Sequence, residues 1–467
     1  MSEFFAYANE QDAPVSIVLP TQKFLTQSTD ANGDRYSAID HPALHQFVTD
    51  VVTGVYGDVE IQAFELGNEY WGSGEMTAVE YGRVSSDMAV TVQSALNDAG
   101  HPDVDIAVQV GHDYSYSNLS DQYAHLDDPQ EILDQLNIKY GTDFGADMLN
   151  HRGDIQWGQV NNGLIMHEFD TTQEQDAIDA VISHVYSRAP FSTYSRDYDL
   201  DIAEDWHAEI DGLTNYVTEW NISSNTSLLD RDTDYGLKQA HEYLNMITNF
   251  ADRNVEMANV WAVQQTAEAA LATSNGDVKV LCEMFTLMSE SLQGAQVIDI
   301  NADSSQEAHV TDTYQANAFY NDGTLVMFIS SLSTHSEDIS LDLSDLMETH
   351  GAVTATSLKV ASPNDIGDAD TAPIVTEDPQ NVSYDDAQLS ISASPYEVVR
   401  IEFADTTLAQ PVDSAPIGAI DRVLEDEEMG IAADDNINEE MDEMAELVAE
   451  SMGAAGIALF LPLLILL

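Results

Sequence analysis

Two glutamates, Glu69 and Glu219, stand at the ends of segments typical of buried β-strands. Glu69 ends the run FELGNE (residues 64–69), and Glu219 lies in VTEWN (residues 217–221). Cleavage of a glycosidic bond needs one protonated carboxyl group, which gives its proton to the leaving oxygen. It also needs one ionised carboxylate, which attacks or shields the positive anomeric carbon. A single glutamate at a strand end is more often a solvated residue, so the hypothesis depends on the two acting together.

Two tryptophans accompany these glutamates. Trp71 lies two residues after Glu69, and Trp220 follows Glu219 directly. A sugar ring offers an apolar C–H face, and a large aromatic ring can pack against such a face. We therefore expect both indole rings to contact a sugar substrate.

The elements that must position these residues alternate between strands and helices up to about residue 295. Apolar runs typical of strands in a parallel sheet cover residues 15–21, 61–69, 105–112, 180–187, 215–221 and 256–265. Amphipathic helical patterns lie between them, for example after Gly74 and before the last strand. The alternation predicts an α/β fold, either a (β/α) barrel or a doubly wound sheet. In a barrel, the carboxyl ends of the strands share one face, so both glutamates would face one pocket.

The pattern changes at about residue 296, where helical periodicity ends. Short β-rich runs with polar turns between them predict an antiparallel β-sandwich over residues 296–405. Residues 1–295 are then the barrel domain. Residues 406–452 are rich in acid and read as a solvated, largely disordered linker. Residues 453–467 form a wholly apolar C-terminal tail.

The two glutamate motifs resemble those of clan A glycoside hydrolases, which share a (β/α)8 barrel. LGNE is similar to the GNE motif of the family 51 α-L-arabinofuranosidases. TEWN lies between that family's EWN and the TEFN of the family 39 β-xylosidases. The resemblance covers roughly residues 15–403, because both families also carry a trailing β-sandwich. The motifs lie 219 − 69 = 150 residues apart with two predicted strands between them, which makes the match more specific than either motif alone.

This resemblance implies a retaining mechanism with a role for each matched residue. Glu69 would be the acid/base and Glu219 the nucleophile, and Asn68 would hydrogen-bond the sugar 2-hydroxyl. The resemblance further implies substrate-binding roles for three residues on later strands: His184, Tyr186 and Trp261. Tyr186 would orient the nucleophile through its hydroxyl. The structural alternative for each of the three is a packed core residue.

The chain departs from the clan pattern at its start. The clan has three strands before the Asn-Glu strand, whereas this chain shows only residues 15–21. A βαβ unit takes roughly 30 residues or more, so two βα units do not fit before residue 15. We therefore expect a TIM-type barrel that lacks its first two βα units, with about six strands, and an N-terminally truncated chain.

The composition excludes several classes of partner and cofactor. The chain has 14 basic and 83 acidic residues, a formal net charge of −69. Such a charge argues against nucleic acid and anionic membrane surfaces as partners, and it is typical of proteins in salty surroundings.

The single Cys282 excludes a disulfide framework and a cysteine-based zinc site. Residues 30–34 (DANGD) alternate oxygen ligands, but the glycine is misplaced for an EF-hand, so we predict a polar turn there. We predict no metal and no cofactor.

The two chain ends bear on localisation. Residues 1–14 have no basic region and no long apolar core, so they do not read as a signal peptide. The tail of residues 453–467 is shorter than the ~20 residues of a spanning helix and would give at most weak membrane or envelope attachment. We expect the full-length gene product to be extracellular or bound to the cell envelope.

Three functional hypotheses remain open from the sequence. The leading one is a retaining glycosidase that acts on plant or algal oligo- or polysaccharide, such as an arabinoside or xyloside. The second is a catalytically inactive carbohydrate-binding or cell-surface protein. The third is transglycosylation, which passes through the same glycosyl-enzyme intermediate as retaining hydrolysis.

Overall fold

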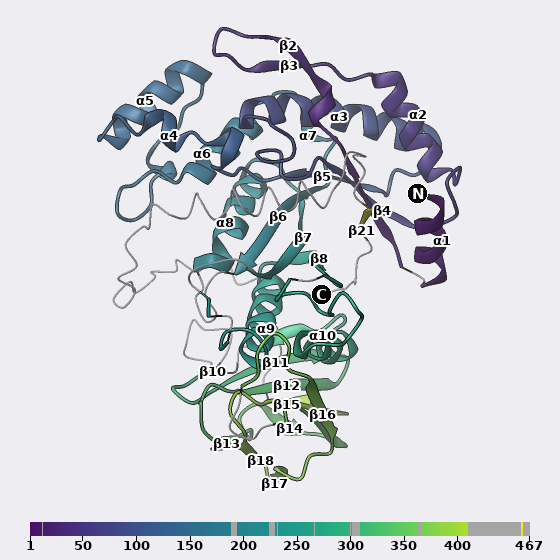
Figure 1. Cartoon of the computed structure of the whole chain (residues 1–467), viewed down its shortest axis with the longest axis vertical. Coiled ribbons are helices and arrows are strands. Elements are labelled where there is room, and N and C mark those ends of the chain that lie inside the picture. The colour runs from purple at the N-terminus through teal and green to yellow at the C-terminus, as the bar shows by residue number, and fades with distance from the viewer. Residues whose placement is uncertain are drawn as a thin grey trace. The chain divides into compact units, whose positions relative to one another are not determined.

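The structure of the chain is a computed structural model (Figure 1). It describes residues 1–11, 13–187, 194–223, 229–230, 232–265, 267–298, 300, 309–361, 366–409 and 459–460. The chain divides into two compact units. The first contains Met1–His184 and Tyr198–Thr218, and the second contains Val185–Asp197 and Glu219–Ile431. The predicted boundary at residue 295 therefore lies inside the second unit.

The first unit alternates strands and helices. Its elements are α1 (Ser2–Glu10), β1 (Val15–Leu19), β2 (Leu25–Thr29), β3 (Arg35–Ser37), α2 (His41–Val52), β4 (Ile61–Leu66), α3 (Ala78–Ala99), β5 (Asp105–Gln109), α4 (Ser120–Tyr123), α5 (Pro129–Tyr140), α6 (Trp157–His167) and α7 (Thr172–Gln175). Three elements pass through the boundary between the units: β6 (Ala180–Ser187), α8 (Tyr194–Glu209) and β7 (Thr214–Ile222).

The strands of the first unit form a parallel sheet. β1 pairs with β4, β4 with β5, and β5 with β6, all in parallel. The two-residue strand β21 (Leu459–Phe460) pairs antiparallel with the other edge of β1. Buried aliphatic and aromatic side chains cover both sides of these strands, which is why their sequences read as near-continuous apolar runs.

Helix α3 is the longest helix of the first unit and has clear signals at both ends. The Thr77 side chain accepts a hydrogen bond from the Glu80 N–H, and the Glu80 carboxylate accepts one from the Thr77 N–H. This capping box satisfies amide groups that the first turn leaves without helical partners. Gly100 ends the helix in the left-handed conformation, at φ 82°. Figure 1 shows α2 beside α3, against which it packs.

The second unit begins with α/β elements and continues as an all-β region. Its elements are α9 (Leu237–Asp252), β8 (Val255–Val260), α10 (Val280–Ser291), β9 (Gln296–Ile298), β10 (His309–Val310), β11 (Tyr314–Asn321), β12 (Thr324–Ser331), β13 (Glu337–Asp342), β14 (Met347–Thr349), β15 (Val353–Val360), β16 (Pro373–Glu377), β17 (Val382–Asp385), β18 (Gln388–Ala393), β19 (Val398–Phe403) and β20 (Thr407–Leu408). Within this unit α9 packs against both α10 and β8.

Two antiparallel sheets make the β-region a sandwich. The larger has the order β10-β11-β12-β19-β15-β16, with β9 also paired to β11, and the smaller has the order β13-β18-β17. Leu325 and Met327 of β12 belong to the same buried cluster as Leu389 and Ile391 of β18. The inner faces of the two sheets therefore share one core, as in other β-sandwiches.

The predicted fold class is confirmed. The six predicted strands are β1, β4, β5, β6, β7 and β8, and they follow one another in this order in a curled parallel sheet with helices. The antiparallel sandwich follows them, as predicted. The sequence analysis did not predict α1 or the β2–β3 hairpin, because neither carries a long periodic pattern.

Some predictions fall on residues outside the described part of the chain. The acidic linker lies there from residue 410 onward, and the apolar tail lies there except for Leu459 and Phe460. Among the helices that the structure describes, none combines the length and apolar character needed to cross a membrane.

Candidate active site

Glu69 lies just past the carboxyl end of β4, in a turn with unusual backbone geometry. Gly67 has φ 93°, and a Cβ there would lie 3.0 Å from Thr21 Cγ2. Glu69 itself has φ 42°, in the left-handed region that residues other than glycine rarely adopt. Such strained residues cost of order 1–3 kcal/mol and cluster at functional sites. The strained backbone is therefore a second indication, besides the sequence motif, that Glu69 has a functional role.

Two stacked tyrosines hold this turn in place. The Tyr81 hydroxyl donates to the Leu66 carbonyl oxygen at 2.6 Å and accepts from the Gln109 N–H at 2.9 Å. It thus joins the carboxyl ends of β4 and β5. Its ring stacks on Tyr70 with the ring centroids 4.4 Å apart, and both rings are fully buried. Burial raises the pKa of both phenols, so they stay neutral hydrogen-bonding groups.

Within the first unit, Glu69 contacts His184 of β6. Nδ1 of His184 lies 3.3 Å from Oε1 of Glu69. The other ring nitrogen, Nε2, lies 3.3 Å from the Thr218 hydroxyl and 3.5 Å from the Gln109 amide nitrogen. The imidazole is nearly buried and so has a fixed orientation. Polar groups on β5 and β7 therefore set the position of His184, which in turn contacts the predicted acid/base.

Asn68 precedes Glu69 and is 9% exposed. Neither its amide nitrogen nor its amide oxygen has a hydrogen-bond partner among the residues that the structure describes. Buried side-chain amides are nearly always hydrogen-bonded, so each exception calls for an explanation. A bound ligand that offers both a donor and an acceptor would satisfy both atoms of Asn68.

Trp71 lies beside this cluster but offers little free surface. Its ring stacks on His112 with the ring centroids 4.6 Å apart and meets Tyr70 edge-on at 5.1 Å. Its centroid is 6.5 Å from that of His184. Only 6% of the residue is exposed. Trp71 thus lies beside the predicted sugar-binding residue His184, with one ring face covered by His112.

In the second unit, Glu219 of β7 pairs with Tyr186 of β6. The Tyr186 hydroxyl donates to Oε2 of Glu219 at 2.8 Å, and Glu219 is 4% exposed. A hydrogen bond to a carboxylate is stronger than one between neutral groups. This hydrogen bond fixes the position of Oε2 and thereby the direction in which Oε1 of the same carboxylate points. The resemblance assigned Tyr186 the role of orienting the nucleophile, and that role stays a prediction.

The two tryptophans of the second unit differ in burial. Trp220 is 0% exposed and packs against Tyr243, Phe250 and Phe285. It lies in the core, where no surface is available for the predicted sugar contact, because adjacent strand residues point to opposite faces. Trp261 is half-buried directly after β8, and its carbonyl oxygen accepts a hydrogen bond from the Asn221 amide.

The sequence analysis missed several residues of these clusters. Gln109 and His112 contact His184 and Trp71 but carried no motif. Thr218 contacts His184 and belongs to the TEWN motif, but no role was assigned to it. Gln109 and His112 offered one usable signal, since both are polar residues near the carboxyl end of a predicted strand. Tyr70 and Tyr81 offered none, because their roles depend on contacts between different elements.

Comparison with known proteins supports the fold. No protein-family model matches the chain, and no curated protein matches its sequence. Solved structures do match it. A family 51 arabinofuranosidase from Xanthomonas axonopodis pv. citri is 14% identical, with 86% of this chain and 78% of that chain covered and a TM-score of 0.52.

Two further family 51 α-L-arabinofuranosidases give the same result. The enzyme from Thermotoga petrophila RKU-1 is 14% identical with a TM-score of 0.51. The enzyme from Bifidobacterium longum is 12% identical with a TM-score of 0.52. In both cases 86% of this chain and 78% of the other chain are covered. At such identities the likeness shows a shared fold and no more.

Proposed function

We propose that this protein is a retaining glycoside hydrolase that cleaves O-glycosidic bonds in oligo- or polysaccharides by double displacement. The observation that carries the proposal is a pair of contacts on β6. His184 contacts Glu69, and Tyr186 contacts Glu219. His184 and Tyr186 are two residues apart on one strand, so their side chains leave the same face. Each predicted catalytic carboxylate thus has its partner on that face.

In the proposed mechanism Glu219 is the nucleophile. Its ionised carboxylate attacks the anomeric carbon and forms a covalent glycosyl-enzyme, while the leaving oxygen takes a proton from Glu69. Glu69 then removes a proton from a water molecule whose oxygen attacks the anomeric carbon and displaces the Glu219 carboxylate. This second inversion releases the sugar with its original anomeric configuration. Retaining enzymes of this type hold the two carboxyl groups ≈ 5–5.5 Å apart.

The surrounding residues have supporting roles in this proposal. Tyr186 orients Glu219, and His184 positions Glu69. The free amide of Asn68 hydrogen-bonds the sugar 2-hydroxyl, an interaction that strengthens in the transition state. Trp71 and Trp261 border the sugar, whereas Trp220 is assigned to core packing. The substrate class is plant or algal carbohydrate, with arabinosides and xylosides as the first candidates.

The proposal is tested with nitrophenyl glycosides, including the α-L-arabinofuranoside and the β-D-xyloside. Glu69→Gln and Glu219→Ala should each lower kcat at least about 100-fold, the lower end of what a positioned acid, base or nucleophile contributes. Azide should restore turnover of Glu219→Ala by replacing its nucleophile. The exposed residues Glu60 and Glu256 supply matched controls, Glu60→Gln and Glu256→Ala.

Two outcomes would contradict the proposal. Product NMR that shows inversion at the anomeric carbon would exclude the double displacement. A folded parent that turns over none of the glycosides but binds a sugar would favour the alternative, a catalytically inactive carbohydrate-binding protein.

A further inference from the structure

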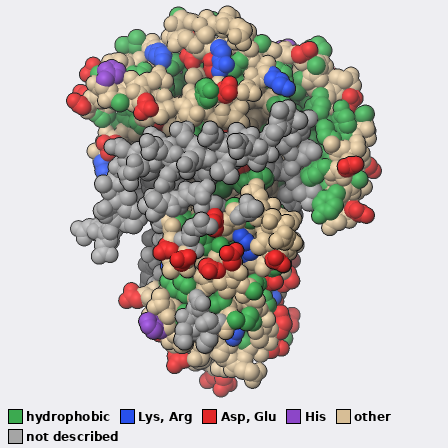
Figure 2. Space-filling view, in the orientation of Figure 1, with side chains coloured by type: hydrophobic (Ala, Val, Ile, Leu, Met, Phe, Trp, Pro, Cys, Tyr) green, Lys and Arg blue, Asp and Glu red, His purple; other side chains and the backbone are tan. Residues whose placement is uncertain are grey.

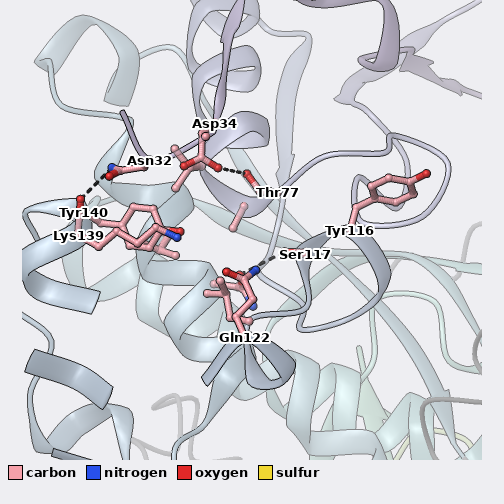
Figure 3. Close-up of a pocket in the computed structure, with 14 residues that line it drawn as sticks. Asn32, Asp34, Thr77, Tyr116, Ser117, Gln122, Lys139 and Tyr140 are labelled. Atoms are coloured by element: carbon pink, nitrogen blue, oxygen red, sulfur yellow. Dashed lines mark hydrogen bonds between the residues drawn. The ribbon is translucent and has the colours of Figure 1, made fainter. Parts of the chain in front are cut away.

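A small cavity of about 150 Å³ lies in the first unit, and Glu69 is not among the residues that line it. Its wall comes from the β2–β3 turn, the start of α3, the segment after β5, and the helices α5 and α6. Figure 3 shows Asp34 and Thr77 on one side, Lys139 and Tyr140 on another, and Gln122 below them. The Tyr116 hydroxyl points away from this group.

Asp34 gives this cavity a buried acceptor. The residue is 4% exposed, and its Oδ1 accepts a hydrogen bond from the Thr77 hydroxyl at 2.9 Å. No donor among the described residues reaches its Oδ2. Leaving a buried acceptor without a hydrogen-bond donor destabilises the folded chain. A ligand that donates a hydrogen bond to Oδ2 would remove this destabilisation.

Lys139 gives the same cavity a donor. Its ammonium lies 4.6 Å from the centroid of the Tyr140 ring, a cation–π contact. Within the described residues its Nζ makes no hydrogen bond and no ion pair. An ammonium has three donors, so Nζ can bind oxygen atoms of a ligand without losing a protein partner.

These groups argue against a cation and for a neutral ligand with hydroxyl groups. A divalent cation would be repelled by Lys139. The nearby Asp30 is also engaged, because it forms an ion pair with Arg83 at 2.7 Å and accepts from two backbone N–H groups. A carboxylate and an ammonium in one cavity balance in charge. Hydroxyl groups satisfy both, since each donates to a carboxylate oxygen and accepts from an ammonium.

The cavity adjoins the turn that carries Glu69. The Tyr116 N–H donates to the Trp71 carbonyl oxygen at 3.1 Å, and the Ser117 hydroxyl donates to the Tyr70 hydroxyl at 3.4 Å. The lining segments follow β1, β4 and β5, so they lie at the same strand ends as Glu69. A sugar held in the cavity would therefore lie on the side of the sheet where bond cleavage is proposed.

We propose that this cavity is a second sugar-binding site, which holds a sugar unit of a longer substrate through Asp34 and Lys139. The link to cleavage rests on the proposed function, whereas the binding itself does not. The site would make the protein select oligosaccharides over single glycosides, because a remote contact adds binding energy that a shorter substrate lacks.

Isothermal titration calorimetry tests the binding in the full chain carrying Glu69→Gln, so that no substrate is consumed. The probes are β-1,4-xylotriose and α-1,5-arabinotriose, with calcium chloride as a separate arm. Asp34→Asn and Lys139→Met, each added to this host, should raise the Kd of at least one trisaccharide tenfold or more. The exposed residues Asp103 and Lys23 supply the controls Asp103→Asn and Lys23→Met, which should leave the Kd within twofold.

The outcomes separate this inference from the proposed function. Trisaccharide binding that is unchanged in both folded variants overturns the second site, as does calcium binding that Asp34→Asn abolishes. If Asp34→Asn does not fold, Lys139→Met alone decides. A parent that shows no glycoside turnover but loses trisaccharide affinity in these variants refutes the glycosidase proposal and supports the sugar site.

Discussion

The Tyr186 hydroxyl donates a 2.8 Å hydrogen bond to Oε2 of Glu219. Glu219 is almost fully buried, so this bond acts where water screens it little. It restricts the carboxylate to one orientation. A nucleophile must approach the anomeric carbon along a narrow range of directions, and a fixed carboxylate meets that requirement without further reorganisation. The role of the Tyr186 hydroxyl in orienting Glu219 can therefore be tested by removing that hydroxyl.

Removing the Tyr186 hydroxyl should weaken catalysis without removing the nucleophile. Hydrogen bonds to charged groups contribute about 1.5–3 kcal/mol, so Tyr186→Phe should lower kcat/KM roughly 10- to 100-fold. The exposed Tyr7 supplies the control Tyr7→Phe. The split between kcat and KM distinguishes positioning from general destabilisation, because loss of an orienting contact should lower kcat and leave KM nearly unchanged. A kcat identical to that of the parent would rule out this role for Tyr186.

The turn before Glu69 should tolerate only glycine at position 67. Gly67→Ala places a methyl group 3.0 Å from the Thr21 side chain at φ 93°. Gly100→Ala is the matched control, because Gly100 also has positive φ but no atom within 4 Å of its Cβ position. The left-handed conformation alone costs about 1–2 kcal/mol, which Gly100→Ala should show in urea unfolding. Gly67→Ala should lower the free energy of unfolding by about 1 kcal/mol more than Gly100→Ala does, and it should also lower kcat. Equal losses of unfolding free energy in the two variants would contradict the close contact.

His241 should make the stability of the chain fall in mild acid. Its ring lies buried on α9, its Nε2 is 3.0 Å from the Tyr396 carbonyl oxygen, and burial lowers its pKa to about 4. The unfolded chain binds a proton near pH 6.5, whereas the folded chain does so only near pH 4. The contribution of neutral His241 to the free energy of unfolding is therefore fully present above pH 6.5 and is lost as the pH falls towards 4.

A variant isolates the contribution of His241. Between pH 7 and pH 4.5 the loss due to this residue should be about 2–3 kcal/mol. His241→Gln keeps a donor for the Tyr396 carbonyl but does not titrate. Between pH 7 and pH 4.5 the free energy of unfolding of this variant should therefore fall by about 2–3 kcal/mol less than that of the parent. Parallel pH curves for the parent and the variant would refute the assignment.

Salt should stabilise the folded chain. The formal net charge of −69 makes carboxylates repel one another, and Figure 2 shows Asp and Glu side chains gathered on the surface of the second unit. Raising the ionic strength from 0.1 to 1 M shortens the screening length from about 10 to about 3 Å. The thermal midpoint should rise by several degrees in sodium chloride. A midpoint that stays unchanged or falls in sodium chloride would exclude stabilisation by charge screening.

The sequence was sufficient to predict the six strands of the parallel sheet, the β-sandwich after them and the two catalytic candidates. Near-continuous apolar runs identify strands buried on both faces, and helical periodicity identifies the helices between them. Glu69 lies just past β4 and Glu219 lies in the second half of β7, and parallel sheets place the carboxyl ends of their strands on one side. These signals are local, so they need no knowledge of which elements pack together.

Only the tertiary structure decided what each side chain contacts. Trp220 and Glu219 are neighbours in the sequence, yet Trp220 packs against α9 and α10 while Glu219 bonds to Tyr186. A strand covered on both sides gives no sequence signal for which face meets the helices, because both faces are apolar.

The β2–β3 hairpin shows the same limit for loops. Its turn reads only as a polar segment, but Asp34 meets Thr77 across 43 residues, and Asn32 meets the Lys139 carbonyl across 107. The residue types and the periodicity of the chain thus determined its fold class and candidate chemistry. The orphaned acceptor of Asp34, the orientation of Glu219 and the burial of Trp220 were decided by long-range packing, which distant segments create together and which no local pattern encodes.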